Sequence, residues 1–236
     1  MKRILSMLLL VSVFIPFTHI FGIGGFGLQV GQSIFSVAES MPPTPTEIDN
    51  VSLTNGSFDG AYVLGGYLYV DAIPFIDLEI DGSLSGNTYD INFSNNSDTP
   101  MTPIPFGWIS SSGYFTARKK VFGLSIPFLA GAKLHAGGGF NTHKTTPVAN
   151  IEIIKNLLGE SNLLEGDLSN LDKNLKDFLT DKNNYISSTG IHIQTGLQLN
   201  ILFLDTFLFY RHTFAENVVP GQDQFGSLNL RIGYGL

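Results

Sequence analysis

Three acidic residues alternate along one short stretch of the sequence: Asp77, Glu79 and Asp81. On a β-strand, residues two apart share a face, so the three carboxylates would point the same way. Two carboxylates that face one substrate can act as general acid and general base if their pKa values differ. Here the spacing follows from strand alternation alone, so we expect a structural role in preference to a catalytic one.

Basic residues occupy the polar faces of other strand-like segments. If these faces line the lumen of a barrel, opposite charges would pair there, because an unpaired buried charge is very costly. Eight strands leave an interior that side chains fill, so we expect an ionic plug and no free ion flow. The predicted lumen network comprises Asp77, Glu79, Asp81, Arg118, Lys120, Lys133 and Arg231, with His135 beside it.

The sequence offers few other reactive groups. It contains no cysteine, which excludes a disulfide framework and thiolate chemistry. The residues His135, His143, His192 and His212 form no His-x-His or His-x-x-x-His pair, so we expect ordinary polar positions and no metal site. No cofactor is expected.

One segment invites an enzymatic comparison: Arg211-His212-Thr213-Phe214-Ala215-Glu216-Asn217, at the outer end of a predicted strand. The position of this segment is similar to that of the His-x-Ser element in the lipid A deacylase barrels. A serine nucleophile needs its base within hydrogen-bond reach, and the residue that shares a face with His212 is Phe214. We therefore expect no enzyme, with lipid modification as the weaker alternative.

The turns between strands indicate the topology. Segments 70–77, 124–130 and 199–205 resemble one another, and the prolines Pro74 and Pro127 within them suit turns because proline cannot donate a ladder hydrogen bond. Longer polar connections lie between these segments, at about 40–56, 94–107, 143–185 and 216–222. Three short turns that alternate with four longer loops predict eight strands, as in outer-membrane barrels.

The strands alternate apolar and polar residues, and in the last one Leu228, Leu230, Ile232, Tyr234 and Leu236 share a face. Lipid outside and a polar lumen inside require this alternation. A soluble lipocalin-like barrel with an apolar interior would show it too. Aromatic residues near strand ends favour the membrane, because they form interfacial girdles.

Composition agrees with an exported barrel. Charged residues make up only 14% of the 236 residues, and Gly 26 and Phe 19 are high. Residues 1–22 carry Lys2-Arg3 and an apolar run, which predicts a cleaved signal peptide before a barrel over 23–236; an uncleaved anchor helix is the alternative. The net charge of −7 argues against a nucleic-acid partner.

The end of the sequence, Leu-Asn-Leu-Arg-Ile-Gly-Tyr-Gly-Leu, resembles the carboxy-terminal assembly signal of bacterial outer-membrane barrels. The organisation of the whole chain is similar to the small eight-stranded families, such as the OmpA membrane domain and the OmpX and OmpW groups. Those proteins usually end in Phe, whereas Leu236 ends this one. The resemblance implies an all-β, eight-stranded, antiparallel, transmembrane up-and-down β-barrel in the bacterial outer membrane. Its partners would be outer-membrane lipid and the barrel-assembly machinery.

The third long loop, about 147–183, has helical periodicity in its apolar residues over 150–181. Asn150 is a plausible N-cap, and Gly159 or Gly166 could separate two short helices. An apolar stripe needs a partner. We expect a lid on the barrel mouth, or else a contact with a surface partner, a small hydrophobic ligand or the membrane surface.

These observations favour a non-enzymatic barrel, a plugged scaffold whose extracellular loops serve surface contact or a structural role. The alternative is a passage for small hydrophobic molecules, with Phe207, Phe209 and Gly137–Gly139 near a lateral or upper opening. That alternative rests on likeness of fold. A soluble exported lipid carrier is the weakest reading.

Overall fold

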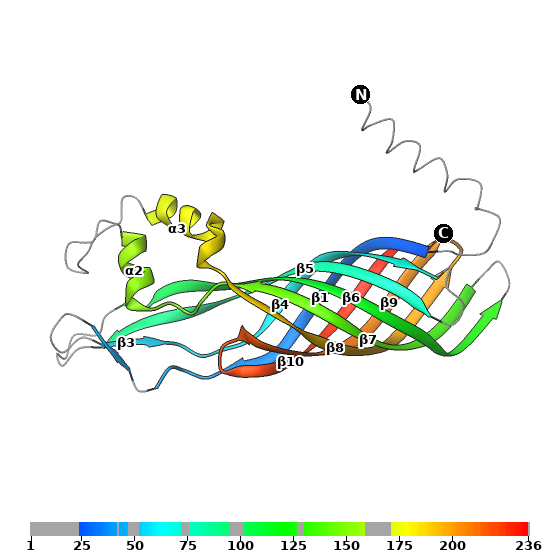
Figure 1. Cartoon of the computed structure of the whole chain (residues 1–236), viewed down its shortest axis with the longest axis horizontal. Helices are drawn as coiled ribbons and strands as arrows, with labels where there is room; N and C mark the ends of the chain where they lie inside the picture. Colours follow the sequence, from blue (N-terminus) through cyan, green and yellow to red (C-terminus); the bar gives the residue numbers. More distant parts are fainter. Residues whose placement is uncertain are drawn as a thin grey trace, which may run out of the picture.

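The computed structural model describes residues 24–41, 43–46, 52–71, 76–94, 102–126, 130–158 and 171–235. The predicted signal peptide, residues 1–22, and the last residue, Leu236, lie outside this part of the chain. Within it, ten strands form one antiparallel sheet, and eight of them close into a ring (Figure 1). The ring consists of β1 (Gly24–Val37), β4 (Phe58–Val70), β5 (Asp77–Ser94), β6 (Ile104–Ile126), β7 (Ala130–Thr145), β8 (Ile186–Ile201), β9 (Leu204–Val219) and β10 (Gln222–Gly235).

Each strand of the ring pairs with its neighbours in sequence, and β1 closes the ring against β10 from Gly25↔Gly235 to Ile34↔Gly226. The eight-stranded up-and-down barrel is thereby confirmed. One short turn, Leu202-Phe203 between β8 and β9, is described. The centres of the other two, residues 72–75 and 127–129, lie outside the described residues.

The opposite end of the barrel differs from the prediction in one connection. We expected a loop over 216–222, but β9 continues to Val219 and only Pro220-Gly221 separates it from β10. Gly221 has a φ of +72°, a left-handed conformation that glycine adopts without strain. This hairpin therefore ends nearer the middle of the barrel than the other strands at the helical end (Figure 1).

On the other side of the rim, β5 and β6 run past the ring and carry two short strands. These are β3 (Ser52–Asn55), which pairs with β5, and β2 (Thr44–Pro45), which pairs with β3. Prolines stand on the free edges, Pro45 on β2 and Pro105 on β6. A proline has no N–H to offer, so these edges are poor templates for another strand.

The barrel wall places apolar side chains outside and polar ones inside. On β10, Leu228, Ile232 and Tyr234 are about half exposed, whereas Arg231 between them is fully buried. The same exposed apolar band covers the other strands of the ring, for example at Leu28. Water would not tolerate so continuous an apolar surface, whereas lipid requires it.

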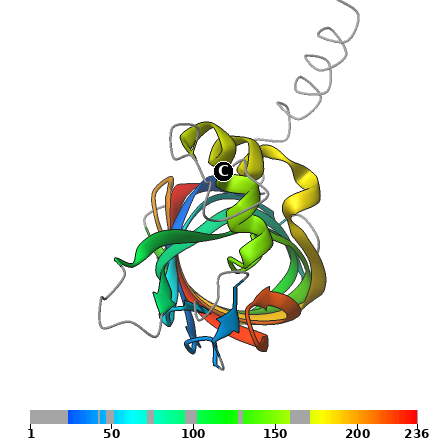
Figure 2. The same ribbon diagram turned by 90° about the vertical axis from the view of Figure 1, so that its left-hand side faces the viewer.

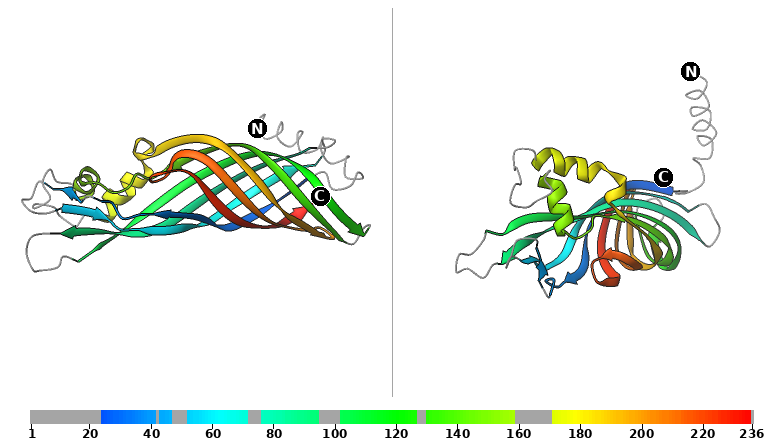
Figure 3. Two further views of the ribbon diagram at one scale, coloured as in Figure 1. Left: turned by 90° about the horizontal axis from the view of Figure 1, so that it is seen from below. Right: turned by 60° about the vertical axis from the view of Figure 1, so that its left-hand side comes forward.

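Two helices follow β7: α2 (Ile151–Leu158) and α3 (Leu171–Thr180), with a 3-10 turn η3 (Lys182–Asn184) before β8. Within the described residues, no helix is long and apolar enough to cross a membrane. Figure 2 looks along the barrel from the helical end and shows α2 crossing the opening of the ring. Figure 3 shows the helices at the end opposite to the start of β1 and the end of β10.

Candidate functional site in the barrel lumen

The centre of the lumen holds two arginines and two carboxylates in close contact. Arg211 on β9 donates two hydrogen bonds to Asp81 on β5, at 3.0 and 2.7 Å. Arg231 on β10 donates to the same carboxylate at 2.8 Å, and its Nη1 lies 2.7 Å from Oε2 of Glu79. All four side chains are buried. Short, charge-assisted and partly bidentate contacts of this kind are the strong class of ion pair.

Amide side chains complete the bonding of this centre. Arg231 Nε donates to Gln29 Oε1 at 2.7 Å, and Arg211 donates from Nε and Nη2 to Gln194 Oε1 at 3.0 and 2.8 Å. Gln194 in turn donates to Glu79 at 3.0 Å. The opposite charges therefore compensate one another, and the neutral amides hydrogen-bond to the remaining donors and acceptors of the charged groups. A buried ion pair needs both.

Arg118 on β6 is held more loosely at the periplasmic side of this centre. Its nitrogens lie 3.7 Å from Asp71, 3.7 Å from Asp77 and 3.4 Å from Glu79. His135 on β7 lies 3.3 Å from Asp77. None of the three carboxylates comes within 3 Å of the buried guanidinium of Arg118.

Aromatic rings line the wall around the three guanidinium groups. Arg211 lies 3.8 Å from the ring centroid of Tyr114, Arg231 4.4 Å from that of Phe209, and Arg118 4.7 Å from that of Tyr69. Phe207 stacks on Phe209 with their centroids 4.8 Å apart. Cation–π contact in a buried site adds to the pairing with carboxylates.

The sequence-predicted residues divide into two sets in the structure. Asp77, Glu79, Asp81, Arg118 and Arg231 come together in the lumen. Lys120 and Lys133 stand apart: Lys120 is exposed and Lys133 is half-buried. For Lys120 the reason is that β6 continues beyond its pairing with β5 toward the periplasmic turn, with a register shift between Lys120 and Phe122. A residue there that alternates with the inward positions is therefore no longer buried.

Arg211 is the charged residue of the ionic centre that sequence reasoning missed. We placed it in the outer segment with His212, and we expected Phe207 and Phe209 near a lateral or upper opening. That expectation is wrong, because both phenylalanines are buried in the lumen, where Phe207 lies against Arg118 and Phe209 against Arg211. The alternation from Asp205 to Thr213 could have placed Arg211 inside the barrel. Phe207 and Phe209 are inward residues of the same series, and they depart from the rule that apolar side chains point outward.

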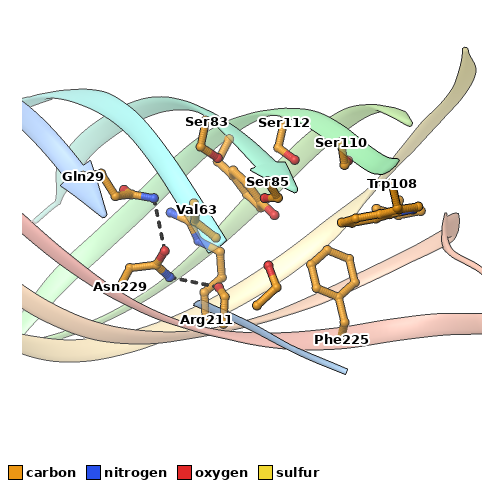
Figure 4. Close-up of a pocket in the computed structure, with 14 residues that line it drawn as sticks. Gln29, Val63, Ser83, Ser85, Trp108, Ser110, Ser112, Arg211, Phe225 and Asn229 are labelled. Atoms are coloured by element: carbon orange, nitrogen blue, oxygen red, sulfur yellow. Dashed lines mark hydrogen bonds between the residues drawn. The ribbon is translucent and has the colours of Figure 1, made fainter. Parts of the chain in front are cut away.

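Above the ionic centre, a layer of small polar residues surrounds a narrow cavity (Figure 4). Serines from β5, β6 and β10 face it, together with Gln29 and Asn229, which are 3.3 Å apart. Its free volume is about 10 Å³, close to what one water molecule needs. The lumen thus contains no continuous channel at this level in the described part of the chain.

Two histidines belong to this polar layer, and a third lies outside the barrel. His143 contacts Ser112 at 2.8 Å and Asn141 at 3.0 Å, and His192 contacts Thr116 at 2.8 Å. Within the described residues, no group of histidine and carboxylate side chains has the arrangement of a metal site. His212 is on the lipid-facing wall, with its ring centroid 4.7 Å from that of Phe214.

An apolar cap closes the extracellular end of the lumen. Trp108 on β6 packs edge-on against Phe35 with centroids 5.3 Å apart, and Phe58 stacks on Tyr89 at 5.3 Å. Ile154 of α2 joins the same buried cluster. The cap also includes Val37, Leu53, Ala61, Ile91, Ala149, Ala215, Val218, Val219 and Phe225.

Hydrogen bonds fix the chain that carries α2 onto this cap. The backbone N–H of Ala149 donates to the Tyr89 hydroxyl at 2.8 Å, and the amide of Asn55 donates to the Ala149 carbonyl at 2.8 Å. Asn150 caps the helix, since its side-chain oxygen accepts from the Ile153 N–H at 2.9 Å. Over these residues, the loop is the lid that the sequence allowed.

A separate pocket of about 480 Å³ opens at the extracellular rim. It is lined mainly by apolar groups of Val37, Ala38, Phe58, Val148 and Pro220. The backbone pairing between β1 and β10 ends just below it, at Ile34↔Gly226. The apolar cap lies between this pocket and the lumen, because Val37 and Phe58 belong to both.

The residues of the predicted assembly signal lie on the outer face of β10. Leu228, Ile232 and Tyr234 are about half exposed, and Leu230 is partly exposed. Leu236 lies outside the described residues. In the closed barrel this face meets lipid.

No protein-family model and no curated protein sequence matches the chain. Among solved structures, the chain is similar to Ail, the attachment invasion locus protein of Yersinia pestis, in complex with the heparin analogue sucrose octasulfate (10% identity, TM-score 0.40, covering 90% of this chain and 99% of that one). It is also similar to the N-terminal β-barrel domain of Pseudomonas aeruginosa OprF (7% identity, TM-score 0.46, 91% and 98% covered). A third is Pseudomonas aeruginosa OprG (10% identity, TM-score 0.42, 91% and 95% covered).

The geometry of the chain itself defines the class of fold. A closed ring of eight antiparallel strands removes every edge of the barrel wall. Its outer face is apolar and its interior is charged and polar. The chain is a small transmembrane β-barrel of the bacterial outer-membrane type.

Proposed function

We propose that this protein is a plugged, non-enzymatic scaffold that holds its extracellular end at the surface of a bacterial outer membrane. The observation that carries the proposal is the filling of the lumen at three successive levels: the ionic centre, the polar layer and the apolar cap. A barrel whose lumen is filled by side chains serves better as a support than as a passage. Residues 1–22 would direct its export and then be removed.

The extracellular face would provide the contacts. Helix α2 is committed to the cap, but α3 projects from the rim and exposes Lys173, Lys176 and Asp177. Asn174 ties α3 to α2 through a 2.8 Å hydrogen bond to the Leu157 carbonyl. A charged surface on a braced helix suits a structural or adhesive contact with another surface.

Other partners follow from the barrel wall. Outer-membrane lipid would cover the apolar band, and the barrel-assembly machinery would recognise the outward residues of β10 before the strand closes against β1. The net charge of −7 gives no basis for nucleic-acid binding.

Single-channel recording in planar bilayers tests the plug. We expect no steady conductance from the full chain, because Glu79, Asp81, Arg211 and Arg231 fill the cross-section. A version with residues 147–183 replaced by a short glycine-serine linker should also fail to conduct, because the ionic centre lies below the cap. Steady, large conductance from either protein would contradict the proposal.

A second candidate function is the uptake of small hydrophobic molecules, and the rim pocket favours it. The neighbouring space of about 160 Å³ shares Val148, Pro220 and Gln222 with that pocket and reaches Trp108, the only tryptophan. A bromoalkane bound there should quench the fluorescence of Trp108. Substituting Ala38→Phe would fill the pocket and should reduce the quenching, whereas Ala136→Phe on the lipid face is the control. Equal quenching in all three proteins would exclude the pocket as a ligand site.

A further inference from the structure

β9 and β10 lie side by side in the barrel wall (Figure 3). Where they pair, three polar side chains on the outer face form a chain of contacts. The hydroxyl of Tyr210 is 3.2 Å from Nδ1 of His212, and Nε2 of His212 is 3.1 Å from Oε1 of Gln224. All three side chains reach the exterior, and the lumen plug does not involve them. The wall therefore carries a connected polar group on a face that otherwise meets lipid.

The position of this chain places it at the upper boundary of the apolar band. Leu208, one step toward the periplasm on β9, and Leu228, directly opposite Tyr210 on β10, are about half exposed, as lipid-facing residues are. Phe214, on the extracellular side, is 38% exposed and packs edge-on against the His212 ring. Polar and aromatic side chains at this depth meet the interface between hydrocarbon and headgroups.

The backbone makes room for the group. Gly226 lies opposite His212, and a Cβ there would come within 2.6 Å of the Tyr210 hydroxyl oxygen. Any other residue would push the tyrosine ring away from the strand. The chain of hydrogen bonds therefore depends on a glycine at this position.

Counting donors and acceptors shows what the group lacks. If the proton of His212 is on Nε2, this nitrogen donates to Oε1 of Gln224, and Nδ1 accepts from the Tyr210 hydroxyl. The amide nitrogen of Gln224 then has no acceptor among the described residues. If Nδ1 carries the proton and the Gln224 amide is turned over, the amide donates to His212, and the Tyr210 hydroxyl becomes the free donor. Either arrangement leaves one donor on the outer wall without an acceptor among the described residues, and a donor without an acceptor is costly wherever water is excluded.

We propose that Tyr210, His212 and Gln224 form an interfacial lipid site that binds the acyl carbonyl oxygens of an outer-leaflet lipid. Ester and amide carbonyls of lipids lie at this depth, between the hydrocarbon core and the headgroups. They are uncharged acceptors, and the site offers neutral donors. A phosphate would call for arginine or lysine, and the nearest cation in sequence, Arg211, points into the lumen and is bound to Asp81. This site is independent of the proposed scaffold role.

Competition between two lipids tests the proposal. The full chain is reconstituted in nanodiscs of equal parts diester and diether phosphatidylcholine, which differ only in the acyl carbonyls. Lipid that remains bound after gentle transfer to detergent is then quantified by native mass spectrometry. We expect the protein to retain the diester lipid about fivefold more than the diether lipid, the ratio that one net hydrogen bond supplies.

Matched variants separate the site from the rest of the wall. The double variant Tyr210→Phe with Gln224→Leu removes the free donor in both arrangements and should bring the ratio close to one. Tyr62→Phe is the control, because Tyr62 is 80% exposed on the same wall and lies outside the chain of hydrogen bonds. Heat-modifiable gel mobility verifies that each variant is folded. A ratio near one for the unaltered protein, or an unchanged ratio in the folded double variant, would overturn the proposal.

Discussion

Removing Arg231 should destabilise the barrel far more than removing Arg118, although the two guanidinium groups are equally buried. Arg231 donates hydrogen bonds of 2.7 Å to Gln29 and 2.8 Å to Asp81, and it lies 2.7 Å from Glu79. Two hydrogen bonds with a charged partner contribute about 3–6 kcal/mol together. This range agrees with the roughly 3–5 kcal/mol lost when one member of a buried ion pair is removed.

Arg118 has a different environment. Its closest carboxylate oxygen, in Glu79, is 3.4 Å away, and its other partners are at 3.7 Å. Its best-defined contact is the ring of Tyr69 at 4.7 Å, and a desolvated cation–π contact contributes about 2 kcal/mol. We therefore expect Arg118→Met to cost about 2 kcal/mol and Arg231→Met about 4 kcal/mol.

Equilibrium unfolding in urea, with the protein in lipid vesicles, measures this difference through the fluorescence of Trp108. For a urea dependence of about 2 kcal/mol per molar, Arg231→Met should lower the midpoint by about 2 M and Arg118→Met by about 1 M. Methionine keeps most of the side-chain volume, so packing changes little in both variants. Equal losses in the two variants, or a larger loss for Arg118→Met, would refute the reasoning from contact distances.

Three further predictions concern the cap and the wall. Ile154→Ala should lower the free energy of unfolding by about 2–4 kcal/mol, because Ile154 is buried in the cap. Amide hydrogen exchange should then become faster in α2, while the ring strands keep their protection. Equally faster exchange in α2 and in the ring strands would contradict a separable cap. Asn150→Ala should weaken α2 by about 1 kcal/mol through loss of the N-cap bond, which the same exchange experiment measures against Asn184→Ala. Gly139→Val should prevent formation of the barrel, because a Cβ at Gly139 would lie 1.9 Å from the Phe115 carbonyl oxygen. Gly107→Val is the control, because a Cβ at Gly107 meets nothing within 4 Å. Gel mobility after refolding distinguishes the two variants, and a folded Gly139→Val would show that β6 and β7 can move apart.

Much of the fold followed from the sequence because a β-barrel is built on local rules. Alternation with a period of two assigned the outward residues Leu228, Ile232 and Tyr234 and the inward residues Glu79, Asp81 and Arg231. Turn residues set the number of strands, and the helical period indicated the insert after β7. Each of these signals lies within about ten residues of the chain and needs no knowledge of distant contacts.

The site was predicted less completely for a physical reason. Arg211 escaped notice because Phe207 and Phe209 on the same strand also point inward, where they pack against guanidinium groups contributed by β6, β9 and β10. An aromatic residue on a strand suits lipid outside and a buried cation inside equally well. Only the neighbouring strands, brought together by ring closure, decide between the two.

By itself, the sequence determined an eight-stranded barrel with an apolar exterior, a charged interior and a helical insert, because these features depend on residue type and spacing along single strands. Tertiary structure alone decided which charges meet, how the rim is closed and where the polar chain of Tyr210, His212 and Gln224 lies. Those features depend on the register between strands and on the height at which each strand leaves the ring. Both quantities are set by pairing across the whole barrel, which local alternation does not encode.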